Sequence, residues 1–176
     1  ASGYSSTFNS FGQIGLIQTP SALSKPEGTV SVILNRNDIW KYGTLSVSPF
    51  DWLEASYFYY RPSDLIWGDK RGLYLDKGFN VKFIVNSKSK KFPALAVGLD
   101  DFAGTGYFAR EYVVTTQTIK NFKISFGTGW GKYTGEEKYK NPLAKFSNRF
   151  VVRPPSSSKY GGAPTYNQWF RGEVSY

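Results

Sequence analysis

Three carboxylates lie close together in the sequence and are the residues best suited to chemistry. Asp100 and Asp101 are adjacent, and Glu111 follows in the next alternating stretch. Two carboxyl groups that flank one glycosidic bond can act as acid and base in sugar hydrolysis, and carboxylate oxygens also bind cations. No further catalytic element lies nearby. We therefore keep a polysaccharide-cleaving enzyme as an alternative and expect the protein not to be an enzyme.

The first two carboxylates also have the features of a turn. Asp100 and Asp101 are followed by Gly104, Thr105 and Gly106. Glycines readily adopt positive backbone dihedrals, and aspartates accept hydrogen bonds from turn amides. We therefore favour a hairpin turn at these five residues over a carboxylate site.

The composition removes several classes of function. The chain has no cysteine and no histidine, so it lacks the commonest general base and the usual soft metal ligands. Its net charge is +9, but the basic residues are spread along the sequence and do not form the dense patch of a nucleic-acid interface. We expect no metal, no cofactor and no nucleic-acid partner.

Most of the chain consists of stretches in which apolar and polar residues alternate with a period of two. In one of them, Phe122, Ile124 and Phe126 alternate with Lys123 and Ser125. This period is typical of β-strands with two different faces. The predicted strands span 29–35, 43–48, 52–61, 78–86, 94–101, 107–118, 122–131 and 168–176. No segment shows helical periodicity, so the predicted fold class is all-β.

The two faces of the predicted strands differ in size and polarity. One face carries bulky residues such as Val32, Tyr57 and Phe83, and the other carries small or polar residues such as Ser46 and Ala96. Charges on a lipid-facing surface cost roughly 2 to 4 kcal/mol each near the bilayer midplane, so this separation favours a membrane wall.

The charged residues inside the strands fall on the small, polar face and alternate in sign along the sequence. They are Glu54, Lys82, Glu111 and Lys123. We predict that they line the interior as a ladder of ion pairs. The same assignment turns the side chains of Tyr112 and Val114 outward.

A polar interior inside an apolar surface is the arrangement of a transmembrane β-barrel. We predict an antiparallel up-and-down transmembrane barrel of about eight strands, or part of a larger barrel. Residues 1–28 form a periplasmic segment that leads into the barrel, and residues 29–176 form the barrel domain. The long loop 132–167 lies outside or folds into the lumen as a plug. The alternative fold is a soluble carbohydrate-binding β-sandwich, in which the polar face is solvated.

Aromatic residues make up 18% of the chain, and tryptophans mark strand ends and loops. Aromatic belts of this kind are typical of membrane interfaces. The predicted girdle consists of Trp40, Trp52, Trp130 and Trp169. Trp67 and Tyr74, in the loop 62–77, are the candidates for stacking on sugar rings.

Several segments together resemble a known family. They are 15–22, 26–29, 49–55, 93–101, 104–108, Glu111-Tyr112, 127–131, 141–143, Arg149-Phe150 and 169–172. These segments resemble the YjbH-like outer-membrane proteins of exopolysaccharide and group 4 capsule gene clusters. Members of that family are longer and carry a lipid-anchored N-terminal cysteine, which has no counterpart among these residues.

The resemblance implies a non-catalytic outer-membrane barrel that assists export or surface assembly of an extracellular polysaccharide. The implied partners are the lipid bilayer, the polysaccharide and other envelope export proteins. The implied location is the outer membrane of a Gram-negative bacterium, and the small polar residues at 1–6 are typical of an exported protein after signal removal.

Overall fold

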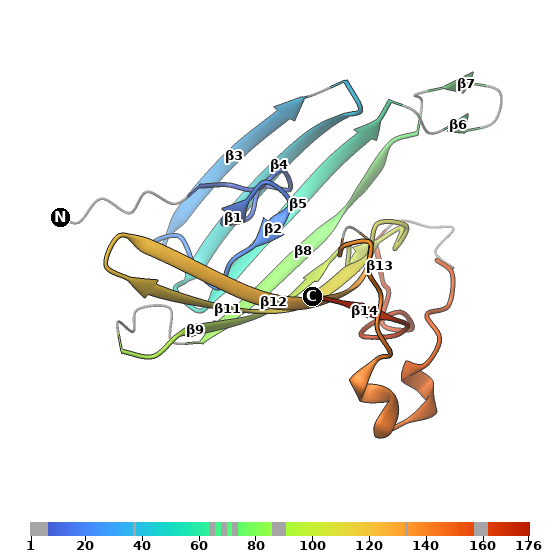
Figure 1. The fold of residues 1–176 in the computed structure, drawn as a ribbon. Helices are drawn as coiled ribbons and strands as arrows, with labels where there is room; N and C mark the ends of the chain where they lie inside the picture. Colours follow the sequence, from blue (N-terminus) through green and yellow to red (C-terminus); the bar gives the residue numbers. More distant parts are fainter. Residues whose placement is uncertain are drawn as a thin grey trace.

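The computed structural model describes residues 7–36, 38–63, 66–67, 70–71, 74–85, 91–132, 134–156 and 162–176. The fold is all-β, and its main element is one antiparallel sheet of eight strands (Figure 1). These strands are β3 (Thr29–Arg36), β4 (Trp40–Phe50), β5 (Leu53–Pro62), β8 (Asp76–Val85), β9 (Ala94–Asp100), β11 (Arg110–Ile119), β12 (Phe122–Gly131) and β14 (Val174–Ser175).

The main sheet follows the order of the sequence. Each strand pairs with the next one in the sheet, from β3 at one edge to β14 at the other. All seven predicted strands between 29 and 131 are confirmed, with ends shifted by a few residues. The eighth is much shorter than predicted, because Phe170 and Gly172 have positive φ angles of 57° and 83° that interrupt an extended chain.

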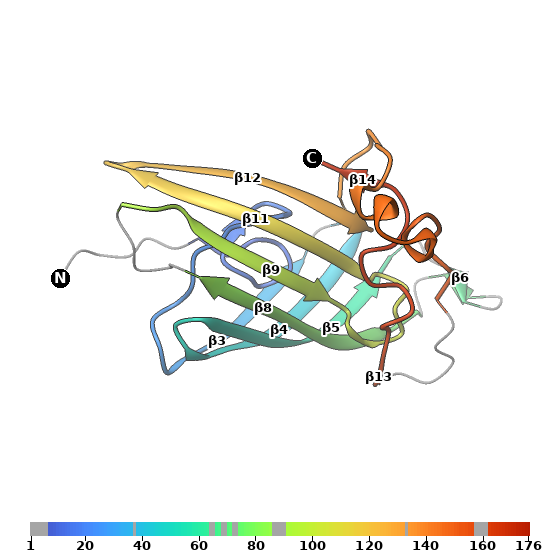
Figure 2. The same ribbon diagram turned by 90° about the horizontal axis from the view of Figure 1, so that it is seen from below.

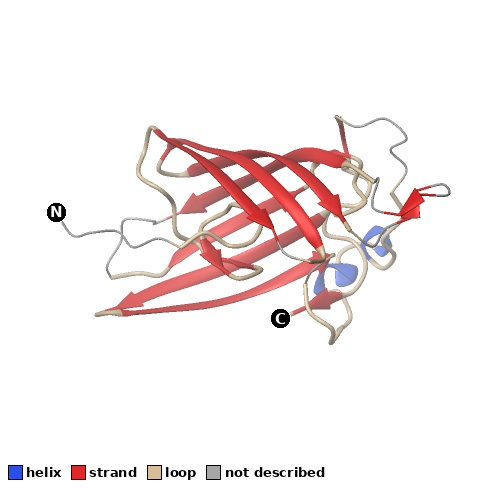
Figure 3. Ribbon diagram, turned by 90° about the horizontal axis from the view of Figure 1, so that it is seen from above, coloured by secondary structure: helices blue, strands red, loops and turns tan. Residues whose placement is uncertain are grey.

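The sheet curls so that β3 to β5 face β11 and β12 across the N-terminal segment (Figures 2 and 3). It is not closed into a barrel within the described residues, because β3 and β14 each have one strand neighbour. Among the described residues, pairing with β14 covers Gly129 and Trp130 of β12, and the rest of this edge of β12 has no strand beside it.

The burial of the sheet is the reverse of that in a soluble domain. The concave face buries polar residues such as Ser46, Ser56 and Asn80, while Val32 is 71% exposed and Phe122 is 72% exposed on the opposite face. Further bulky residues exposed on the convex face are Val30, Leu34, Leu45, Tyr57, Tyr59, Phe79, Phe83, Val85, Leu95, Ile124 and Phe126. The predicted separation of the faces is therefore correct for these strands, with the polar face inside.

The face assignment is wrong for β11. Tyr112 and Val114 are both 4% exposed and lie on the concave side, level with Gly98 and Ala96 of β9. Both faces of this strand carry apolar residues, so the period alone did not fix its orientation. Glu111 therefore lies on the opposite face of β11.

Shorter elements lie on the concave face and at one end of the sheet. β1 (Gly15–Leu16) and β2 (Thr19–Pro20) form a small hairpin, β6 (Ile66–Trp67) pairs with β7 (Lys70–Arg71), and β10 (Ala103–Gly104) pairs with β13 (Ala163–Pro164). Two 3-10 helices, η1 (Pro142–Lys145) and η2 (Asn148–Phe150), belong to the connection between β12 and β14. None of the helices in the described ranges is long and apolar enough to span a membrane.

Candidate functional site: the polar concave face

The concave face is occupied by the N-terminal segment, residues 8–25, which we call the N-terminal unit. It lies between the two halves of the curled sheet (Figure 2). The unit lacks the regular alternation of the strands, and its chain folds back through the β1–β2 hairpin. Its buried residues include Gln13, Ile14, Ala22 and Lys25. The polar face of the sheet is therefore covered by this chain's own polar and small residues.

A buried ion pair on the sheet holds the end of the unit. Glu54 of β5 and Lys82 of β8 are direct cross-strand neighbours, and Glu54 Oε1 lies 3.3 Å from Lys82 Nζ. The Lys82 ammonium also donates to the carbonyl oxygens of Ser21 and Leu23, at 3.4 and 3.0 Å. Lys82 therefore contacts its carboxylate partner and the backbone of the unit at once.

A second lysine approaches the same carboxylate from the unit itself. Lys25 is 3% exposed and donates to Ser46 Oγ at 2.6 Å. Burial lowers the pKa of the Lys25 ammonium, and the Glu54 carboxylate opposes this shift. Within the described residues neither oxygen of Glu54 accepts a hydrogen bond, so the two ammonium groups supply its electrostatic compensation.

A second ion pair holds the middle of the unit. Asp100 of β9 and Arg110 of β11 are cross-strand neighbours, and Arg110 donates to Asp100 Oδ2 from Nε at 2.8 Å and from Nη2 at 2.5 Å. Gln13 donates to the other oxygen of Asp100 at 2.5 Å, and Arg110 Nη1 donates to the Gln18 carbonyl at 3.0 Å. The guanidinium also lies over the Phe11 ring, 4.9 Å from its centroid.

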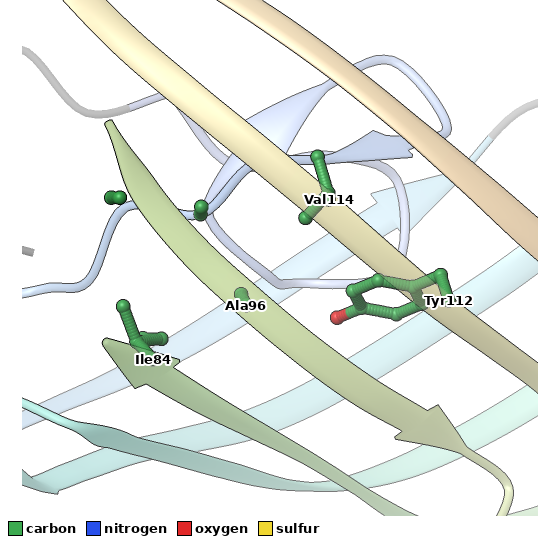
Figure 4. Packing of buried hydrophobic residues seen from close by; sticks show 6 residues of the cluster. Ile84, Ala96, Tyr112 and Val114 are labelled. Atoms are coloured by element: carbon green, nitrogen blue, oxygen red, sulfur yellow. The ribbon is translucent and has the colours of Figure 1, made fainter. Parts of the chain in front are cut away.

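Small apolar side chains complete the contact between the unit and the sheet. Ala22 packs in a buried cluster with Ile84, Ala96 and Val114 from β8, β9 and β11 (Figure 4). The Ala22 backbone amide donates to Thr116 Oγ1 at 2.9 Å. The small residues of the predicted inner face thus leave room for a chain segment.

The predicted turn after β9 has an unusual buried carboxylate. Asp101 has a positive φ of 51° and accepts the Phe108 amide at 3.3 Å, while Thr105 donates to Asp76 Oδ2 at 3.0 Å. Burial, followed by the nearby Asp76 carboxylate, raises the pKa of Asp101 to about 8. Gly104 packs directly on the Asp101 carboxylate, where a β-carbon would collide.

The remaining residues of that turn complete it without forming a three-carboxylate site. Gly106 has a positive φ of 69°, and Asp101 Oδ1 accepts no hydrogen bond within the described residues. Asp100 accepts a hydrogen bond from Arg110, whereas Glu111 accepts one from Arg153. The structure therefore does not bring Asp100, Asp101 and Glu111 together as one carboxylate group.

Glu111 anchors the connection between β12 and β14. Arg153 donates to its two carboxylate oxygens, from Nη1 at 2.5 Å and from Nη2 at 3.0 Å. Arg153 also donates to the carbonyls of Ala109 and Gln168, and the Phe170 amide donates to Glu111 at 3.0 Å. The described part of the long loop, 134–156 and 162–167, thus lies at one end of the sheet (Figures 1 and 2) and not on the concave face.

The predicted ladder is only partly assembled. Glu54 and Lys82 meet, but Glu111 pairs with Arg153, and Lys123 lies near the exposed end of the β11–β12 hairpin, opposite Thr118. No strand covers this half of β12 in the described chain, which explains the exposure of Lys123. The second cross-strand pair on the concave face is Asp100–Arg110.

The predicted aromatic girdle is also only partly seen. Trp52 is exposed on the convex face and stacks between Phe50 and Phe83, with ring centroids 5.3 and 6.4 Å away. Trp40 instead packs inside against Tyr60.

The other two girdle tryptophans are covered by the C-terminal part of the chain. Trp130 is buried against Phe170, and Trp169 donates to Thr165 Oγ1 at 3.3 Å. Of the predicted sugar-stacking residues, Tyr74 packs near Tyr107, with centroids 5.9 Å apart. Trp67 lies in β6, but its side chain is outside the described residues.

Several residues that hold the concave face together did not stand out in the sequence. Gln13 and Lys25 precede the first alternating stretch, and Arg110 and Arg153 are single basic residues without a motif. Arg110 lies two residues before Tyr112, so the two side chains share one face of β11. A correct assignment of Tyr112 to the inner face would therefore have placed Arg110 there as well.

All of the described residues lie within the match to one known family. Residues 7–176 match the YjbH family, described as "Exopolysaccharide biosynthesis protein YbjH". The chain belongs to the YjbH family. A curated relative, "Uncharacterized lipoprotein YjbH" of Escherichia coli (strain K12), is 35% identical over 172 residues. The alignment covers 94% of this chain and 24% of that protein, so the chain spans about a quarter of the length of this relative.

No solved structure matches this YjbH family chain. Its concave face presents fixed ion pairs, hydroxyls and small side chains to a chain segment. Among the described residues, no group of three or more acidic side chains is placed to hold a metal ion. The arrangement binds a segment of this chain through polar contacts.

Proposed function

We propose that this chain forms part of the wall of an outer-membrane β-barrel that assists export or surface assembly of an extracellular polysaccharide, without covalent chemistry. The observation that carries the proposal is the inverted sheet: Glu54 and Lys82 are buried, while Val32 and Phe122 are exposed. Lipid accepts such an apolar surface, whereas a contiguous apolar face of this kind exposed to water favours association.

Closure of the wall is part of this proposal. The barrel is completed by further strands that pair with the open edges at β3 and β12. Both edge strands alternate apolar and polar residues in the same way as the strands between them. An eight-stranded barrel has an interior that side chains fill, so passage of a polymer requires a wider ring. The relative that is four times longer has the length for further strands.

The family supports the polysaccharide context. The family is described by exopolysaccharide biosynthesis, and the Escherichia coli relative is named a lipoprotein, which fits attachment to the cell envelope. The buried polar groups of the concave face, rather than any carboxylate pair, are the part of the chain suited to contact the polymer.

A pair of arginine substitutions tests the membrane wall. Leu45→Arg places a charge at the middle of β4 on the exposed convex face, and Val152→Arg places the same charge at an exposed site in the connection at the end of the sheet. We expect Leu45→Arg to reduce the amount of folded protein in outer-membrane fractions and Val152→Arg to leave it unchanged. A soluble protein would tolerate both, and equal tolerance would overturn the proposal.

A further inference from the structure

We infer that the N-terminal unit is an internal plug that leaves the concave face as one body when the polymer passes. This inference rests on the proposed function and adds the step that clears the interior of the barrel. It depends on three features of the described residues: how the unit is held together, how it is held to the sheet, and how it is joined to β3.

The unit is held together by its own backbone. The Asn9 amide donates to the Gln13 carbonyl at 2.8 Å, and the Ser10 amide donates to the Ile17 carbonyl at 2.5 Å. The Ser21 amide donates to the Ile14 carbonyl at 3.0 Å. Asn9 Oδ1 additionally accepts the Gln13 amide at 2.9 Å. These bonds stay intact if the unit moves as a whole.

The unit is held to the sheet through side chains. Lys82, Arg110 and Thr44 donate to its backbone carbonyls, and Asp100 and Thr116 accept from it. Among the described residues, no backbone–backbone hydrogen bond joins residues 8–25 to a strand of the main sheet. Departure of the unit therefore breaks no strand pairing.

The sheet also keeps its charges compensated without the unit. Glu54–Lys82 and Asp100–Arg110 are pairs within the sheet, so each charge retains its partner after the unit leaves. These groups become accessible to water and to the hydroxyl groups of a sugar chain. The buried ion pairs thus allow two states of the interior, one filled by the unit and one filled by water or polymer.

The connection to β3 and the free space beside the unit allow this movement. Pro26, Glu27 and Gly28 are exposed. Gly28 has a φ of 77°, and no described atom lies within 4 Å of the position that a β-carbon on Gly28 would take. A groove of about 460 Å³ separates the β1–β2 hairpin at Thr19 from Gly127 of β12. The Thr29 amide donates to the Pro26 carbonyl at 3.2 Å and the Gly28 amide donates to the Ser48 carbonyl at 2.8 Å, so the turn 26–29 stays with the sheet. The unit can therefore pivot where residue 25 joins this turn, without first displacing a strand.

A disulfide that locks the unit to the sheet tests the inference, because the chain has no native cysteine. The lock is Ala22→Cys/Thr116→Cys, where the Ala22 amide lies 2.9 Å from Thr116 Oγ1. The control is Val97→Cys/Val113→Cys, a cross-strand pair between β9 and β11 that leaves the unit free.

Polysaccharide released into the medium is measured with and without reductant, for variants first shown to reside in the outer membrane. We expect the lock to abolish release under oxidising conditions and release to return on reduction, while the control disulfide has no effect. Locked protein that still releases polysaccharide at the parental rate would show that the unit does not move. Absence of the protein from the outer membrane would instead count against the proposed function.

A labelling experiment reports the movement directly. Ser46→Cys places a thiol at a fully buried site under Lys25, where a membrane-impermeant maleimide cannot reach it while the unit is in place. We expect labelling in cells that produce the polysaccharide and protection in cells that do not. Equal labelling in both would contradict a plug that opens with transport.

Discussion

Glu54 and Lys82 face each other across the β5–β8 ladder, and both side chains are almost completely buried on the concave face. An ion pair so far from water is stable only when each charge keeps its partner, because an uncompensated buried charge is strongly unfavourable. This pair also determines how the N-terminal unit is held, since Lys82 donates to two of its carbonyls.

Glu54→Gln leaves Lys82 and Lys25 without their carboxylate. We expect the free energy of unfolding to fall by about 3 kcal/mol or more, as for other broken buried pairs. Urea unfolding of detergent-solubilised protein measures this loss. In Glu54→Gln/Lys82→Met only one buried cation remains, and part of the stability should return. A double variant that is as unstable as the sum of both single changes would show that the two groups do not interact.

Asp101→Asn should change how stability depends on pH. The pKa of Asp101 rises from 3.8 to about 8 on folding, so the folded state binds a proton that the unfolded state releases between these values. This contribution to stability is complete at low pH and is lost as pH rises through about 8.

Asparagine keeps the shape of Asp101 but does not ionise, and it tolerates the positive φ. The variant should therefore gain stability relative to the parent as pH rises through this window, measured as the shift in the urea midpoint. Asp38→Asn, at an exposed site, serves as the control and should show no such gain.

Arg153→Met should release the connection between β12 and β14 from the sheet. The side chain makes four hydrogen bonds, to both oxygens of Glu111 and to two carbonyls. Its loss leaves the Glu111 carboxylate with the Phe170 amide as its one remaining hydrogen-bond donor among the described residues. We expect proteinase K to cleave within 134–156 about tenfold faster, at the low end of what the loss of a hydrogen bond to a charged group implies. Arg149→Met, at an exposed residue of the same connection whose guanidinium lies over the Phe150 ring, should cleave at the parental rate.

Gly98→Ala should be destabilising because the Tyr112 ring lies directly over Gly98 on the neighbouring strand. A β-carbon there would overlap the ring, and overpacking of this kind costs about 1 to 3 kcal/mol. Tyr112→Leu in the same chain should recover part of the loss. Gly43→Ala is a matched strand glycine whose β-carbon would find only an ordinary contact at 3.5 Å, to Leu34. Similar losses at both glycines would exclude the ring contact as the cause.

The strands could be predicted because the pattern that identifies each one lies within its own residues. Alternation in β3, β4, β5, β8 and β9 identifies both the strand and its inner face. It fails where both faces are apolar, as around Tyr112, and where another segment covers a strand end, as at Trp130. Those cases depend on contacts between residues far apart in the chain.

The occupation of the concave face could not be predicted from local pattern. Gln13 and Lys25 have no periodicity around them, and their positions depend on Asp100 and Ser46, which lie far away in sequence. The ladder was predicted from alternating charge, but the reversed orientation of β11 turns Arg110 inward and Glu111 outward. Lys123 is exposed because no strand pairs with its half of β12 in the described chain.

The strand count of the sheet limits how any closed form can be built. The eight strands run alternately up and down, so β3 and β14 point in opposite directions. A ring in which every neighbour is antiparallel can accept further strands only in multiples of two, namely none, one hairpin, two hairpins and so on. Insertion or deletion of a single strand would force one parallel seam, so a ring that stays antiparallel throughout can lengthen or shorten only by whole hairpins.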